Sequence, residues 1–197
     1  MPKKRSIDNH PYHLFAVPNG PNAHAFLKAV FDVFPPGSHL VPVSESDNAR
    51  AHVTGQALRE TMCAGLTPDF INQSLFANSC FLFAQLDKAP HNLLGLVSIK
   101  LVNDNQLYID LICTNPKYSG LGTQFLNLLQ EMARRSHRTR IDANAVNASV
   151  PFFVAKGFRK SARNNKKALT HVRLRVTKRR KAARSETKRT RKHPKTH

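Results

Sequence analysis

The chain has 197 residues, of which 41% are apolar, and it carries a formal net charge of +19. This length suffices for one domain with its own core, and no apolar run approaches the ~20 residues of a membrane-spanning helix. The three cysteines form no CxxC pair, so the sequence predicts neither a disulfide framework nor a zinc ribbon, and favours a reducing compartment.

The N-terminal part begins with a basic arm, residues 1–11, which contains PKKR. Residues 13–17 (HLFAV) are predicted to form a strand, and Phe26 and Val30 lie on one face of a following helix. A second helix is predicted over 49–64. Thr67 before Pro68 is typical of a helix start, because Thr caps and Pro suits the first helical position.

A change of pattern follows at residue 80. Three apolar runs, at 80–86, 93–102 and 107–113, are separated by short polar links, which predicts an antiparallel meander. A helix is expected after Gly122, a strand at 140–146, and a short helix within 148–158 that ends near Gly157.

The last predicted strand covers residues 168–176. There apolar residues and Thr170 alternate with His171, Arg173 and Arg175, as in a strand with one buried face.

The segment KYSGLGTQF, residues 117–125, joins a strand to a helix through two glycines one residue apart. Such a turn exposes backbone N–H groups at a helix N-terminus, where an anion is favourably bound. The segment is neither a GxGxxG fingerprint nor a P-loop. A plain structural turn is the alternative interpretation.

The pattern Lys117-x-x-Gly120-x-Gly122 after a strand resembles the acyl-CoA loop of the GNAT acetyltransferases. Asn147 followed by FFVAKGF is similar to a second signature of that family, with Phe153 at the position of its tyrosine. The order of predicted elements over residues 12–176 also agrees. The resemblance implies a mixed α/β sheet of the GNAT fold, acetyl-CoA as co-substrate, and no metal.

The resemblance also implies which residues bind acetyl-CoA. The loop and helix start would bind the pyrophosphate, the preceding strand would pair with the pantetheine arm at a bulge, and two downstream positions would line the site. These residues are Leu111, Ile112, Cys113, Lys117, Tyr118, Ser119, Gly120, Leu121, Gly122, Thr123, Asn147 and Phe153.

Transfer of the acetyl group requires a neutral amine and an oxyanion donor. Gln106 stands where some relatives carry a catalytic glutamate and cannot act as a base. Asp110 has the strand parity of Gln106 and Tyr108, so we expect Asp110 to act as base through water, with Tyr108 as a further proton donor. The structural alternatives are that Asp110 orders a neighbouring loop or caps a helix, and that Tyr108 only packs as a half-buried side chain.

Two other chemistries are weaker. Cys113 could act as a covalent nucleophile, but a small buried thiol that only packs is the favoured interpretation. His10 and His13 have no third ligand at a suitable spacing, so no metal site is predicted.

The predicted function is that of an acetyl-CoA-dependent N-acetyltransferase acting on an amine of a protein or small molecule by direct attack in a ternary complex. The alternative is a catalytically inactive GNAT-fold protein that binds nucleic acid or chromatin, as Phe153 and Gln106 would allow.

Residues 177–197 are predicted to be a disordered polybasic tail. From residue 159 onward the chain has 17 Lys or Arg and one acid, whereas residues 1–158 carry a net charge of +3. The runs KRRKAAR and KRTRK indicate binding to nucleic acid or another polyanion, or nuclear import. We therefore expect an intracellular protein, in the nucleus or the cytoplasm, with no membrane partner. A tail that only increases solubility is the alternative.

Overall fold

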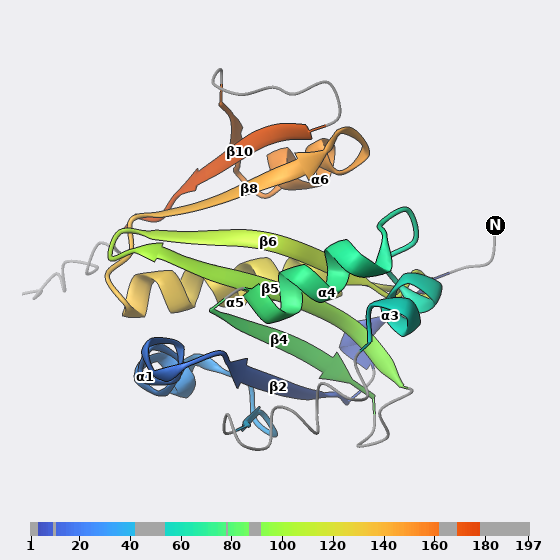
Figure 1. Ribbon diagram of the computed structural model, residues 1–197, viewed down its shortest axis with the longest axis horizontal. Helices are drawn as coiled ribbons and strands as arrows, with labels where there is room; N and C mark the ends of the chain where they lie inside the picture. Colours follow the sequence, from blue (N-terminus) through green and yellow to red (C-terminus); the bar gives the residue numbers. More distant parts are fainter. Residues whose placement is uncertain are drawn as a thin grey trace, which may run out of the picture.

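An eight-stranded mixed sheet, with helices on both faces, organises the chain (Figure 1). The computed structural model describes residues 4–9, 11–41, 54–77, 79–86, 92–161 and 169–177. The strand order is β3-β2-β4-β5-β6-β8-β10-β9, and a separate parallel pair joins β1 to β7. In the orientation of Figure 1, α4 lies in front of the sheet and α5 behind it.

Short elements precede the centre of the sheet. They are β1 (Arg5–Ser6), the 3-10 helix η1 (Ile7–Asn9), β2 (His13–Pro18), α1 (Pro21–Val30), η2 (Phe31–Val33), β3 (His39–Leu40), α3 (Gly55–Thr61) and α4 (Pro68–Ala77). The predicted start of α4 is confirmed, because the Thr67 hydroxyl accepts a hydrogen bond from the Phe70 N–H at 3.3 Å. The helix predicted over 49–64 is shorter in the structure, and residues 49–53 of it lie outside the described residues.

The centre and C-terminal half follow the predicted order closely. They contain β4 (Cys80–Gln85), β5 (Leu93–Asn103), β6 (Gln106–Thr114), β7 (Tyr118–Ser119), α5 (Leu121–Arg135), β8 (Arg140–Val146), η3 (Asn147–Ser149), α6 (Val150–Ala155), β9 (Arg159–Lys160) and β10 (Leu169–Arg175). Strands β4, β5 and β6 pair antiparallel in sequence, which confirms the meander.

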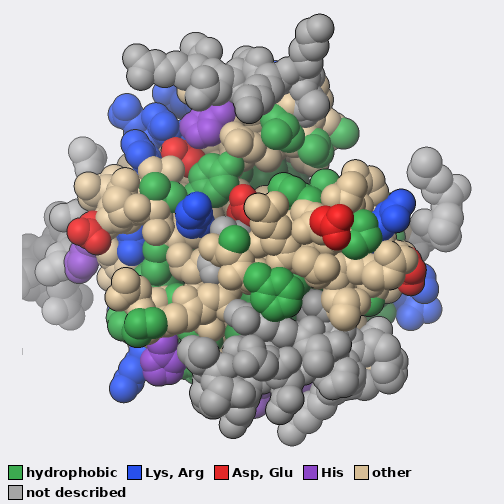
Figure 2. All heavy atoms as spheres, in the orientation of Figure 1, with side chains coloured by type: hydrophobic (Ala, Val, Ile, Leu, Met, Phe, Trp, Pro, Cys, Tyr) green, Lys and Arg blue, Asp and Glu red, His purple; other side chains and the backbone are tan. Residues whose placement is uncertain are grey.

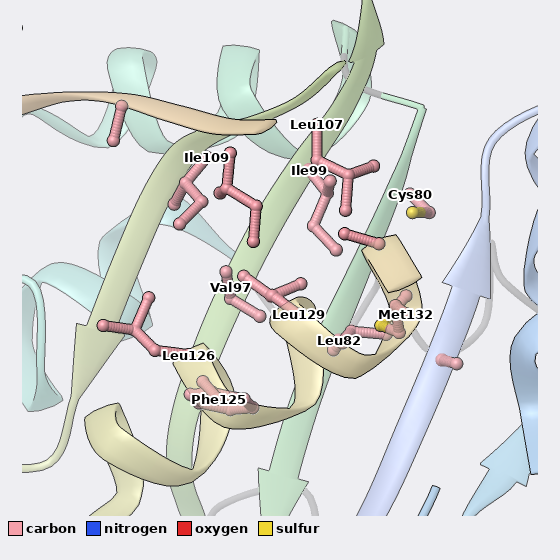
Figure 3. Packing of buried hydrophobic residues seen from close by; sticks show 14 of the residues in the cluster. Cys80, Leu82, Val97, Ile99, Leu107, Ile109, Phe125, Leu126, Leu129 and Met132 are labelled. Carbon is pink, nitrogen blue, oxygen red and sulfur yellow. The ribbon is translucent and has the colours of Figure 1, made fainter. Parts of the chain in front are cut away.

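Two cores cover the two faces of the sheet. On one face, apolar side chains of α5 pack on strands β4 to β6 (Figure 3); the labelled helix residues are Phe125, Leu126, Leu129 and Met132. Gly95 of β5 permits this approach, because a β-carbon there would lie 2.6 Å from Leu121 Cδ2. On the other face, Leu58 of α3 and Leu75 of α4 pack against the strands.

One expectation about the cysteines was wrong. The structure pairs Cys63, in the turn after α3, with Cys113 of β6 in a disulfide, although their separation of 50 residues follows no recognisable spacing motif. The packing of α3 and α4 on the sheet brings them together. Their Cα atoms lie 5.4 Å apart, and sequence spacing alone does not reveal such a contact. Cys80 is free and buried.

Two further expectations concern the C-terminal tail and membrane-spanning helices. Beyond Thr177, the predicted tail lies outside the described residues. Among the helices that are described, none combines the length and apolar character needed to span a bilayer.

Candidate active site

The centre of the sheet opens at a bulge in β6. Ile109 lies opposite Ile99 of β5, but Leu111 lies opposite Ser98, so Asp110 is an extra residue in the ladder. Up to Ile109, β6 also pairs with β8 in parallel; beyond that point the described ladder between the two strands ends, and β8 continues beside β10. The bulge predicted within this strand is therefore present, and β6 and β8 separate there.

A cavity of about 600 Å³ lies at this separation. Its walls come from the two separating strands, the turn between α3 and α4, and α6. Its polar lining includes Tyr108, Asp110, Asn144 and Ser149, whereas Met62, Leu66, Phe70, Val146 and Leu169 make much of it apolar. The cavity is also lined by four residues that the family resemblance assigned to cofactor binding, Leu111, Ile112, Cys113 and Phe153.

Tyr108 and Asp110 line the same cavity, as the sequence predicted, whereas Gln106 is not among the residues that line it. The bulge interrupts the strand alternation after Ile109, so the position of Asp110 depends on the bulge and not on strand parity alone. Burial raises the pKa of the Tyr108 phenol, and the negative charge of Asp110 raises it further. The Asn144 N–H, which hydrogen-bonds the Tyr108 oxygen, acts in the opposite direction. The phenol is therefore protonated at neutral pH and can donate a proton or a hydrogen bond.

Gln106 belongs to a buried polar cluster outside this cavity lining. Its Nε2 donates to Asp142 Oδ2 at 3.0 Å, and its Oε1 accepts from Arg140 Nη2. Asp142 is 1% exposed and also accepts from Arg173 Nε at 2.9 Å and Nη2 at 3.2 Å. Gln106 therefore helps hold β6, β8 and β10 together. Sequence patterns gave no sign of Asp142, because an alternating strand does not reveal which acid will be enclosed.

The predicted anion loop follows β6 and is shaped by Asn115. The Asn115 Oδ1 accepts from the Lys117 N–H at 3.0 Å, and its carbonyl accepts from the Tyr118 N–H at 3.1 Å. Gly120 then adopts φ = 100° as the N-cap of α5, a conformation that L-residues with a side chain rarely adopt. No side chain caps this helix end. The first-turn N–H groups of α5 are thus oriented for an external anion.

The other predicted cofactor residues lie around this loop at different depths. Lys117 and Ser119 are exposed, Tyr118, Gly122 and Thr123 are partly buried, and Leu121 is in the core. A ring atom of Phe152 would lie 3.2 Å from a β-carbon on Gly122, so α6 packs beside the first turn of α5.

Asn147 is set apart from the cavity lining. It is exposed in η3, and its Oδ1 accepts from the Thr170 hydroxyl at 3.2 Å. The structure therefore brings Phe153 to the cavity and leaves Asn147 at its outer side.

The basic arm contacts the anion loop, which the sequence did not indicate. Strand β1 pairs with β7 in parallel, and the Arg5 N–H donates to the Lys117 carbonyl at 3.0 Å. Ile7 is fully buried in the core that also contains α5. Gln124 Nε2, in the first turn of α5, donates to Asp8 at 2.8 Å.

The Cys63–Cys113 disulfide forms part of the cavity wall. It joins the turn after α3 to β6 next to Ile112, so both cysteines are bonded and neither is a free thiolate there. Among the described residues, no group of three or more His, Cys, Asp or Glu side chains is arranged to hold a metal ion.

The sequence pattern of the GNAT acetyltransferase domain matches residues 50–178, which is more than half of the chain. The chain belongs to the GNAT acetyltransferase family. No curated protein matches this GNAT sequence.

Solved structures show the same GNAT fold at low sequence identity. Tetrahymena GCN5 is 12% identical with a TM-score of 0.52, over 66% of this chain and 89% of that one. A candidate N-acetyltransferase from Lactobacillus plantarum is 13% identical with a TM-score of 0.53, over 85% and 100%. Ard1 from Thermoplasma volcanium is 9% identical with a TM-score of 0.50, over 67% and 93%. The predicted mixed α/β GNAT fold is thereby confirmed.

Proposed function

We propose that this protein is an acetyl-CoA-dependent N-acetyltransferase that transfers an acetyl group to an amine in a ternary complex. The main support for the proposal is that one strand, β6, contributes to three features of the candidate site. Strand β6 contains the bulge, lines the cavity and ends at the loop that leads into α5. A thioester in the cavity and a pyrophosphate on the loop would be parts of one extended ligand.

The pyrophosphate end fits the loop by charge and shape. The first-turn N–H groups of α5 converge at a positive helix end, and the Gly120 backbone has no Cβ to hold a ligand away. Lys117 is exposed beside this turn and supplies a cation. Loop residues 118–123 contribute mainly backbone groups, so their side-chain identities matter less.

The pantetheine arm needs a strand edge. One edge of β6 pairs with β5 through Thr114, while beyond Ile109 the other edge has no ladder partner among the described strands. An extended arm can pair with that edge at Leu111, Ile112 and Cys113 by main-chain hydrogen bonds. The same stretch of N–H groups can stabilise the oxyanion formed at the thioester carbon.

The acceptor must lose a proton before or during attack. A lysine-like amine with a pKa near 10.4 requires roughly 4–5 kcal/mol for deprotonation at pH 7. Asp110 lines the cavity and can take this proton through water. The amine nitrogen then bonds to the acyl carbon, the C–S bond breaks, and the sulfur leaves as a thiolate.

Tyr108 can supply the proton that the departing thiolate takes up. Phe153, at the family's tyrosine position, lines the same cavity but has no hydroxyl. The Tyr108 phenol, with its raised pKa, retains a proton at neutral pH. Tyr108 lies on β6, so the cavity has a phenol on a different wall from Phe153.

A direct experiment measures thiol release. Acetyl-CoA is incubated with the full chain and a mixture of peptide, polyamine and small-molecule amines, and the free thiol of coenzyme A is followed. Amine-dependent release, with mass spectrometry showing an added acetyl group, is the expected result. Acetyl-CoA binding by calorimetry without any turnover on the mixture would instead support the second function.

That second function is a catalytically inactive GNAT-fold protein that binds nucleic acid or chromatin. Gln106 favours it, because this residue is fixed by Asp142 and Arg140 and provides no base. We also propose that residues 177–197 bind nucleic acid or another polyanion and direct the protein to the nucleus. The composition of the tail supports this, since ten of its residues are Lys or Arg and only Glu186 is acidic.

A further inference from the structure

The C-terminal edge of the sheet carries an unusual concentration of arginine. Strands β8, β9 and β10 contain five Lys or Arg residues and a single acid, Asp142. In Figure 2, Lys, Arg and His side chains gather over the region of β8 and β10, around one acidic side chain. Four guanidiniums and one imidazole share one side of these strands. This surface, the arginine face, consists of Arg140, Arg159, His171, Arg173 and Arg175.

The pairing register places these side chains together. Arg140 lies opposite Arg175, Asp142 opposite Arg173, and Arg173 opposite Arg159. Residues directly opposite each other in a sheet point to the same side. The intervening residues, including Ile141, Ala143 and Val172, are buried on the other side in the core with α5. Among the described helices, α4 lies in front of β5 and β6 and leaves the front of β8 and β10 open (Figure 1).

Asp142 neutralises only part of this charge. It is bonded to Arg173, and Arg140 Nε and His171 Nε2 lie 3.7 and 3.6 Å from its Oδ2. Arg159 and Arg175 are exposed, and neither makes an ion pair with a residue that the structure describes. The pair to Asp142 fixes Arg173 and its neighbours in place, while Arg159 and Arg175 remain available to a ligand.

The arginine face connects two functional parts of the molecule. At one end, Val146 and Leu169 pair with each other and line the cavity. At the other end, Arg140 pairs with Arg175, and the polybasic segment begins two residues later. Along β8 these ends are six residue steps apart, a distance of about 20 Å. A metabolite with one phosphate does not span such a distance, whereas a polymer with regularly spaced charges does.

We propose that the arginine face is a nucleic-acid docking surface of the folded domain, which holds a phosphodiester backbone between the tail and the cavity. Guanidinium groups bind phosphate oxygens as a fork, and the face contains arginines in preference to lysines. The adjoining tail has the composition typical of nucleic-acid contacts. Phosphate contacts carry no sequence information, so the surface binds without sequence preference. This inference concerns binding and does not depend on acetyl transfer.

The test uses the full chain with Arg159→Ala and Arg175→Ala combined, because Arg173 and Arg140 support the buried Asp142 and their loss can disturb folding. The matched control is Lys28→Ala with Arg59→Ala, two exposed cations on α1 and α3 that are removed from β8, β9 and β10. Fluorescence anisotropy with a labelled duplex and a labelled single strand, over a series of salt concentrations, gives the affinity and the slope of log K against log salt. Circular dichroism and thermal melting check that both variants fold.

On duplex DNA, the slope becomes less steep by about 0.9 for every phosphate that the protein ceases to neutralise. We expect the arginine-face variant to lose roughly one to two units of slope and to bind at least several-fold more weakly at low salt. The control should differ little from the unmodified protein. An unchanged slope in the arginine-face variant, or an equal loss in the control, would overturn the proposal.

A second arm distinguishes nucleic acid from an acidic protein partner. Labelled poly-glutamate is titrated at the same ionic strength, with the same variants. Weaker binding of poly-glutamate than of nucleic acid, with less dependence on Arg159 and Arg175, supports a phosphate-binding surface. If poly-glutamate binds as tightly as nucleic acid and depends equally on Arg159 and Arg175, the proposal is overturned in favour of an acidic polypeptide as the partner.

Discussion

Ile7 lies directly against Gly120: a β-carbon on Gly120 would come within 3.1 Å of Ile7 Cγ2. The fully buried side chain of an N-terminal residue thus supports the loop that is proposed to bind the pyrophosphate. Because Gly120 also has φ = 100°, any substitution there perturbs the turn as well as the binding surface. Tests of the loop therefore need a variant that changes charge without changing backbone.

Lys117→Glu is that variant. The Lys117 side chain is exposed, and its N–H is held by Asn115, so the backbone should persist. A hydrogen bond to a charged group contributes about 1.5–3 kcal/mol, so calorimetry should show acetyl-CoA binding weakened by roughly ten-fold or more. The melting temperature should be unchanged.

Gly120→Ala serves as the contrasting control. It should lower both the affinity and the melting temperature, since a non-glycine residue at this φ costs roughly 1–2 kcal/mol. If the Lys117→Glu variant and the unmodified protein bind acetyl-CoA with equal affinity, the charge of Lys117 does not contribute to the binding site.

The proposed base is tested by Asp110→Asn. Turnover at pH 7 should fall by about 10²–10⁴-fold, the range of general-base contributions, with little change in acetyl-CoA affinity. The deficit should shrink at higher pH, because more of the acceptor amine is already neutral. A loss below about threefold that does not vary with pH would assign Asp110 to ordering the bulge.

Tyr108→Phe separates proton donation from deprotonation. Because the raised pKa of Tyr108 keeps the phenol protonated below about pH 10, its contribution should be constant from pH 6 to 9. Turnover should therefore fall by a factor that does not depend on pH in this range. A deficit that follows the titration of the acceptor amine would show that Tyr108 acts on the amine and not on the leaving thiolate.

Gln106→Glu tests whether a glutamate at this position can restore a base. The new carboxylate would lie about where Nε2 now donates to Asp142 at 3.0 Å, next to a buried negative charge. We expect loss of stability of about 1–3 kcal/mol in urea unfolding and no gain in turnover. Gln106→Met, similar in length and uncharged, is the control for lost hydrogen bonding. A rise in turnover with Gln106→Glu would show that a carboxylate at position 106 can accept a proton from the acceptor amine.

Sequence patterns predicted the elements of this fold well but not its side-chain partners. The meander and β8 were readable because runs of strand length between polar links leave few alternatives. The turn between β6 and α5, with Lys117, Gly120 and Gly122, was predictable because a local backbone turn requires local residues. Asp142, Ile7 and the Cys63–Cys113 disulfide were missed, since each depends on contacts between segments far apart in the chain.

The thiol content of the protein tests the disulfide. Burial raises the pKa of Cys80 to about 12, so its thiol should not react with Ellman's reagent at pH 8 in the native protein. We expect no reactive thiol in the native form, one after unfolding without reductant, and three after unfolding with reductant. Three thiols without reductant would show that Cys63 and Cys113 are reduced in the isolated protein. Cys63→Ser then provides a control, because it should expose one additional thiol, that of Cys113.

Removal of residues 177–197 tests the division between domain and tail. The Val176 N–H donates to the Thr139 carbonyl at 2.8 Å, so the described sheet is anchored up to this residue and the truncated chain should melt as the full chain does. Loss of ten cations should reduce the slope of log K against log salt by several units, at about 0.9 per phosphate on duplex DNA. The binding that remains should depend on Arg159 and Arg175.

A fluorescent fusion of the truncated chain should spread from the nucleus to the whole cell. Acetylation of a small amine should persist, because the cavity is formed before residue 170. An unchanged salt slope in the truncated protein would show that the tail does not contact phosphates, and unfolding would show that it is part of the domain.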